Sequence, residues 1–137
     1  MSEHVSGQGL FSSGGHRWVW GDQERRAKEF MTVAVTGAGS MLLNNGPRPG
    51  VVAGILKGDG ASRASADQDL SDLEDAIEAL CRTGLAYSWE DDHGHRGDHL
   101  VLRAFTREGM REYGVVGTTW NAWQSFRVQV RELDGKP

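Results

Sequence analysis

The chain has 137 residues, one cysteine and a formal net charge of −4. A chain of this length buries enough surface to fold as one domain without a metal ion or a disulfide. The lone Cys81 rules out an internal disulfide framework and is typical of folding in a reducing cytoplasm. The negative charge and the scattered basic residues argue against general binding to nucleic acid or to anionic membranes.

Residues 1–15 are rich in glycine and serine, and they predict a flexible, extended N-terminal arm. Such an arm becomes ordered only where a neighbouring surface holds it. It contains neither an apolar run nor a basic leader, and no later stretch approaches the ~20 apolar residues of a membrane helix. We therefore expect no standard secretion signal and no membrane insertion, and we place one folded domain at residues 16–137.

Turns and short strands dominate the pattern that follows the arm. The 19 glycines stand singly between apolar runs, which predicts many turns. Alternating apolar residues predict strands at residues 17–20, 30–36, 41–43 and 51–56, and the Asn, Gly and Pro residues of 44–50 predict a turn. The five tryptophans are expected to serve as core or contact anchors.

A polar segment and an amphipathic helix occupy the middle of the chain. Residues 57–66 are small or polar, and they predict a mobile loop or an intersubunit arm. Residues 67–83 predict one helix, capped at its start by Ser65 or Asp67 and closed by Arg82 and Gly84. Its apolar side chains recur every three or four positions. The acidic side chains are expected on the opposite, solvated side and near the positive end of the helix dipole: Asp72, Glu74, Asp75 and Glu78.

A β-hairpin and a closing strand are expected after the helix. Residues 85–89 alternate as one strand, residues 90–97 form a polar turn, and residues 99–106 form the second strand. Residues 126–130 alternate again, which predicts a strand with one buried face. Because strands and helices do not alternate as βαβ units, the pattern favours a mainly β, α+β fold. We expect an antiparallel β-sandwich or small barrel of about seven strands with one helix packed across it.

The turn after the first hairpin strand holds the strongest candidate for chemistry. His93, His95 and His99 lie among four carboxylates, and in an extended segment they would share one side, where a zinc or iron ion could bind. The alternative is that Asp, Gly and His fill a solvated turn, in which polar side chains need no partner. Turn histidines also lack the supporting hydrogen bonds that metal ligands need. We therefore assign no metal ligand and no cofactor.

The remaining motifs indicate no catalytic residue. Residues 36–40 lack the third glycine of a phosphate-binding fingerprint, and residues 54–60 lack the Gly-Lys-Ser or Gly-Lys-Thr of a P-loop. Ser40 lies in no nucleophile elbow, and Cys81 falls on the apolar face of the helix, where a buried thiol is inert. The sequence thus predicts that the chain is not an enzyme. Glycine-rich arms, polar loops and surplus tryptophans instead favour assembly with another subunit.

The order of elements along the chain has a counterpart in known proteins. The helical run at residues 73–80 and Gly84 are followed by runs at residues 87–91, 100–105 and 120–133. This order resembles the tail structural proteins of tailed bacteriophages, above all tail-tube and distal-tail proteins. The resemblance implies a β-sandwich or barrel with a single flanking helix, whose copies join sheet edge to sheet edge.

The function that this resemblance implies is structural. Copies would self-associate into rings around a channel for DNA passage, in a virion that is assembled in the host cytoplasm. Residues 1–15 and 57–66 would grip the next ring. Because the chain is short for a tube subunit, the alternative within the tail is a terminator, connector or baseplate component. Two alternatives come from other classes of protein: a small metal-dependent enzyme that uses the histidine turn, and a module that binds a ligand or partner through the tryptophans.

Overall fold

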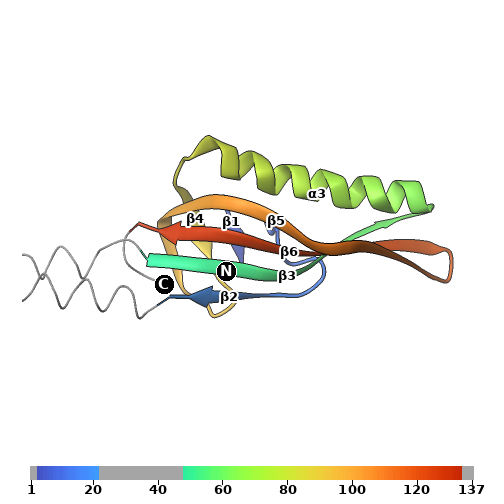
Figure 1. The fold of residues 1–137 in the computed structure, drawn as a ribbon. Helices are drawn as coiled ribbons and strands as arrows, with labels where there is room; N and C mark the ends of the chain where they lie inside the picture. Colours follow the sequence, from blue (N-terminus) through green and yellow to red (C-terminus); the bar gives the residue numbers. More distant parts are fainter. Residues whose placement is uncertain (1–2, 22–47, 134–137) are drawn as a thin grey trace, which may run out of the picture.

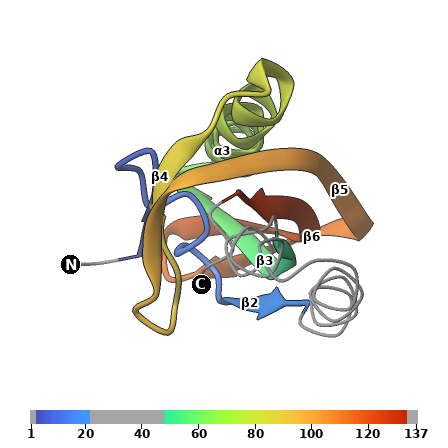
Figure 2. The ribbon, with the colours of Figure 1, turned by 90° about the vertical axis from the view of Figure 1, so that its left-hand side faces the viewer.

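The computed structural model describes residues 3–21 and 48–133. These residues form one curled, antiparallel six-stranded sheet with a single long helix packed along it (Figures 1 and 2). The strand order is β1-β4-β5-β6-β3-β2, so the strands at the two margins of the sheet are β1 and β2. The expected mainly β, α+β fold is confirmed. The sheet is an open, half-barrel arrangement and not two stacked sheets.

The strands differ greatly in length, and three of them carry the molecule. Their bounds are β1 His4–Val5, β2 His16–Trp20, β3 Arg48–Gly60, β4 Tyr87–Glu90, β5 Arg96–Val116 and β6 Thr119–Glu132. The strands expected at residues 17–20 and 51–56, the hairpin after the helix and the closing strand are confirmed. Those expected at residues 30–36 and 41–43, with residues 44–47 of the expected turn, lie outside the described residues. For residues 48–50 the expected turn is wrong, because they belong to β3.

The core lies on the face of the sheet that the helix covers. Buried side chains alternate with exposed ones along β3 and β6, as the period of two in a strand requires. Helix residues complete this core from above the sheet, and the N-terminal segment completes it from the side. Its largest fully buried apolar side chains are Phe11, Leu56, Leu70, Ile77, Trp89, Leu100, Leu102 and Phe126.

Helix α3 spans Arg63–Thr83 and begins earlier than its apolar pattern indicates. The N-cap is Ser62, whose side chain accepts a hydrogen bond from the Ser65 amide while the Ser65 hydroxyl accepts one from the Ser62 amide. Gly84 ends the helix at φ 66°, a left-handed conformation that suits glycine. The expected end is confirmed. The expected N-cap is wrong, and the first turn holds no acidic residue.

The loop expected at residues 57–66 is also wrong, because β3 runs to Gly60 and the helix starts three residues later. Its glycines have a packing role. A Cβ placed on Gly58 would lie 2.5 Å from the Leu70 amide nitrogen, and one on Gly60 would lie 2.6 Å from the Ala66 nitrogen. The small residues therefore let the helix backbone approach the sheet. Low apolar content here reflects that close contact and not mobility.

The N-terminal segment also departs from the expected arm. From Glu3 onward it lies against the sheet: β1 pairs with β4, and the side chains of Val5, Leu10 and Phe11 are buried. Phe11 stacks on Phe126 with ring centroids 5.6 Å apart. The same chain therefore supplies the surface that orders this segment. A contact with another subunit is not needed for that.

Aromatic stacking closes the curl of the sheet. Trp89 on β4 stacks on Trp18 of β2 at 5.9 Å between ring centroids and lies 5.1 Å from Trp20. The expectation that several tryptophans anchor the core is confirmed for Trp18 and Trp89, which are 2% and 1% exposed. Within the described ranges, no helix combines the length and the apolar character needed to cross a bilayer.

Candidate assembly surfaces

The histidine turn is built around one buried carboxylate. Asp91 accepts hydrogen bonds from the backbone amides of His93 and His95, each at 2.9 Å, and from the indole of Trp20 at 3.0 Å. Burial by itself would raise the pKa of Asp91, but these hydrogen bonds outweigh it and hold the pKa below its usual value. Asp91 therefore shapes the turn and ties it to β2.

The three histidines themselves are spread over two elements. His93 and His95 are exposed on the turn with ring centroids 6.2 Å apart, while His99 lies on β5. The His95 ring also contacts Asp91, at 3.1 Å. In residues 3–21 and 48–133, no group of three or more His, Cys, Asp or Glu side chains could hold a metal ion. The arrangement in the structure is that of a hydrogen-bonded turn.

Cys81 lies half-buried near the end of α3. Burial, helped by the nearby Glu78 carboxylate, raises the pKa of the thiol to about 11. A thiol with so high a pKa carries almost no thiolate at neutral pH and is a poor nucleophile. Its side chain packs against the core instead.

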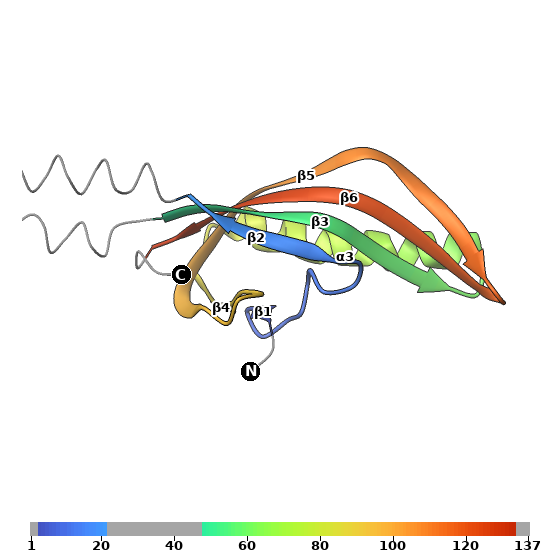
Figure 3. The ribbon, with the colours of Figure 1, turned by 90° about the horizontal axis from the view of Figure 1, so that it is seen from below.

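The far half of the β5–β6 hairpin, residues 106–126, which we call the arm, forms one end of the sheet and lies beside the last residues of β3 (Figures 1 and 3). The register of β5 against β6 shifts between Glu108 and Glu112. The buried Gln124 amide donates to the carbonyl of Gly109 at 3.2 Å and so satisfies part of this irregular backbone. A two-residue turn, with Gly117 at φ 63°, closes the arm.

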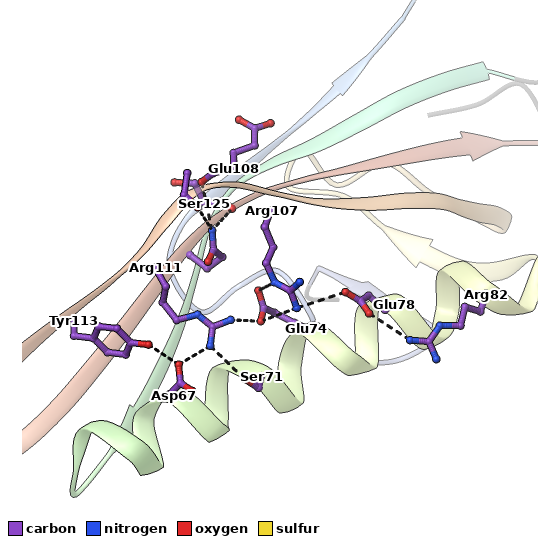
Figure 4. A network of polar contacts seen from close by, with 12 residues as sticks. Asp67, Ser71, Glu74, Glu78, Arg82, Arg107, Glu108, Arg111, Tyr113 and Ser125 are labelled. Atoms are coloured by element: carbon purple, nitrogen blue, oxygen red, sulfur yellow. Dashed lines mark hydrogen bonds and ion pairs between the residues drawn. The ribbon is translucent and has the colours of Figure 1, made fainter.

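An ion-pair network fastens the arm to the helix (Figure 4). Glu74 of α3 is fully buried and accepts hydrogen bonds from Arg107, at 2.8 Å to Nε, and from Arg111. Arg111 also donates to Asp67 at 2.7 Å, and the Tyr113 hydroxyl donates to the same carboxylate at 2.7 Å. Both bonds lower the pKa of Asp67, the Tyr113 bond most. These contacts hold the arm in a fixed direction.

The expectation that Glu74 lies on the solvated side of the helix is wrong. Glu74 follows Leu70 by four residues and precedes Ile77 by three, which places it on the apolar stripe. A carboxylate at such a position needs a cationic partner to be buried. That position was the available signal, but the sequence alone does not show which arginine would reach it from β5.

Two backbone edges of the sheet lie without a partner strand among the described residues. The outer edge of β2 has no partner strand among the described residues. On the other side β4 pairs with β5 only as far as Leu100, so no described strand lies along the outer edge of β5 from Val101 to Val116. An unpaired edge displays rows of free amide and carbonyl groups that can pair with another chain.

The sheet face opposite the helix carries several arginine side chains. Arg17, Arg103, Arg127 and Arg131 all lie on β2, β5 and β6. Arg127 pairs with Glu108 at 3.0 Å. No described carboxylate lies within ion-pair distance of the other three. An open cavity of about 430 Å³ lies on this face, lined mainly by Val19, Pro49, Val51, Arg103, Val130 and Arg131.

The lining of this cavity can be compared with the expectation that a ligand or partner binds through the tryptophans. None of the residues that line it is a tryptophan. Trp18 and Trp89 are used in the core, and Trp20 donates its indole N–H to Asp91.

Comparisons with known proteins add no relative: no protein-family model, no curated protein and no solved structure matches the chain.

Proposed function

We propose that the chain is a structural protein of a bacteriophage tail, a tube, distal-tail or tail-completion component, that self-assembles into rings around a channel for DNA. The observation that carries this proposal is the pair of unpaired edges, one along β2 and one along β5 from Val101 to Val116. The first edge lies at one margin of the sheet, and the second begins on β5 beyond the residues that β4 covers. Two different surfaces that meet head to tail generate a closed ring when the rotation between copies closes.

The physical reason for ring closure is the cost of leaving these edges free. Exposed edges promote uncontrolled aggregation unless they are covered, charged or paired. The edge of β5 is long, and its arm is fixed in direction by Glu74, Arg107 and Arg111. A rigid edge loses little entropy when a neighbour pairs with it, which favours ordered association over random contact.

Ring formation is tested by light scattering coupled to size-exclusion chromatography, together with negative-stain imaging. We expect a concentration-dependent oligomer and ring-shaped particles. A strict monomer at high concentration, without particles, would overturn the proposal.

Pairing of the edges is tested with cysteines in a Cys81→Ala background. Val19 and Ala104 share one row of the sheet, with Val51 and Gln129 between them, so they lie about 14 Å apart within one copy. That separation exceeds the Cα distance that a disulfide can span. Val19→Cys with Ala104→Cys should therefore give a ladder of covalent oligomers under mild oxidation, through contacts between copies.

The matched control is Val19→Cys with Ser125→Cys. Ser125 is exposed like Ala104 but lies on β6, away from either edge. We expect monomers from this pair. Equal ladders from the two pairs, or no ladder from the first in a sample that forms rings, would exclude edge-to-edge pairing.

A further inference from the structure

The closed end of the arm exposes apolar side chains that the rest of the molecule does not cover. Met110, Val115 and Val116 are 89%, 50% and 72% exposed. Val115 and Val116 lead directly to the turn at Gly117, whereas Met110 lies seven residues before it, at the register shift between Glu108 and Glu112. Adjacent exposed apolar side chains at the tip of one element indicate a contact surface, whereas single exposed ones are ordinary.

The cavity on the open face lies at the other end of the same strands. It lies where the start of β3 meets the end of β6, at the pair of Pro49 and Arg131, with Val19 of β2 and Arg103 of β5 also in its lining. The arm closes where Val116 pairs with Thr119. Residues 119 and 131 of β6 are separated by about 40 Å along a strand. An arm therefore reaches such a cavity only on another copy of the chain (Figures 1 and 3).

The two surfaces are complementary in polarity. Val19, Pro49, Val51 and Val130 make the cavity apolar, and the guanidinium groups of Arg103 and Arg131 make it basic. Glu112 is exposed and lies two residues before Gly114 and four residues before Val116, so the three residues share one face of β5. No described cation lies within ion-pair distance of it. An apolar tip with a carboxylate behind it thus matches an apolar cavity with arginines beside it.

We propose that the arm tip of one copy docks in the cavity of a second copy, so that copies stack end to end along the strand direction. Val116 enters the cavity from the face of β5 that also carries Glu112, and Glu112 lies toward Arg103 and Arg131 of the receiving copy. This inference rests on the proposed function, in which the sheet edges join copies within a ring. It assigns the contact between successive rings to the arm and not to residues 1–15 or 57–66.

The test compares Val116→Lys with Ala79→Lys, and the readout is the ratio of stacked to single rings in negative-stain images. Val116 is exposed in the single chain, so its replacement should leave the thermal unfolding midpoint unchanged. A lysine there meets Arg103 and Arg131 without a partner, and we expect end-to-end association to weaken about tenfold while single rings persist. Ala79→Lys adds the same charge on the exposed face of α3 and should leave stacking unchanged.

A charge exchange between Arg103 and Glu112 tests whether these two side chains meet in the contact. Arg103→Glu and Glu112→Arg should each reduce stacking, and the double variant should restore it, because the two charges would again be opposite. Two outcomes would overturn the docking of the arm and leave ring formation standing. The first is equal stacking in Val116→Lys and in the unchanged chain. The second is a double charge variant that stacks no better than the single ones. A sample without rings would overturn both proposals.

Discussion

The ion-pair network offers the sharpest prediction about stability. Replacing Glu74 by glutamine removes the only fully buried charge of the network and leaves Arg111, whose side chain is 17% exposed, with Asp67 as its remaining anion. Breaking a buried pair costs about 3–5 kcal/mol. The side chain of Arg107 is 49% exposed, so water replaces much of what it loses. We therefore expect Glu74→Gln to lower the free energy of unfolding by about 2–3 kcal/mol.

Urea unfolding followed by tryptophan fluorescence measures this loss, since Trp18 and Trp89 are buried in the core. The midpoint should fall while the denaturant slope stays constant, and the thermal midpoint should drop by roughly 6–10 °C. The matched control is Asp75→Asn, at an exposed position one residue away, which should stay within about 0.5 kcal/mol of the unchanged chain.

A double variant separates the ion pair from simple packing loss. Glu74→Leu with Arg111→Met replaces the buried pair by apolar groups of similar size, and it should be much less destabilised than the sum of the two single changes. If Glu74→Gln unfolds at the same urea concentration as the Asp75→Asn control, the burial of this charge does not hold the arm to the helix.

Three further predictions concern the turn, the thiol and the contact between helix and sheet. Because the folded-state pKa of Asp91 is depressed, its stabilisation is complete above about pH 4 and is lost as the pH falls through that lower pKa; Asp91→Asn should flatten this acid branch in unfolding curves recorded at stepped pH. Cys81, with a pKa of about 11 against a usual 9.0, should react with a thiol reagent at pH 8 roughly a hundredfold more slowly than in the unfolded chain, and equal rates would refute its burial. Gly58→Ala should cost about 1–3 kcal/mol in urea unfolding, since its Cβ would meet helix backbone. Gly21→Ala, where a Cβ would meet Pro49 at an ordinary 3.5 Å, should stay within about 0.5 kcal/mol.

Local patterns were enough to predict much of the fold. The spacing of Leu70 and Ile77 predicted the helix, and Gly84 its end, because a period near 3.6 residues and a left-handed C-terminal residue are local properties. Alternation predicted the strand at residues 126–130 and the hairpin after the helix. The single apolar face of each of these elements was enough to predict a mainly β fold covered by one helix.

The errors share one cause, which is contact between segments distant in sequence. Residues 57–66 look like a loop because they are small and polar, yet Gly58 is small so that Leu70 can approach. The segment at residues 3–15 looks like an arm because it is rich in glycine, yet Phe11 finds a stacking partner more than a hundred residues away in Phe126. Composition reports what a segment can do alone and not which surface it will meet.

The candidate assembly surfaces also combine features that local sequence predicts with features that depend on tertiary contacts. The sequence by itself determined the residue types: a charged helix stripe, a polar turn with three histidines, arginines that alternate on β6, and apolar residues before Gly117. Only the tertiary structure decided that Glu74 is buried against Arg107 and Arg111, and that the cavity and the arm tip lie at opposite ends of one sheet. The physical reason is that side-chain periodicity is set within a few residues, whereas strand order and register are set by packing across the whole chain.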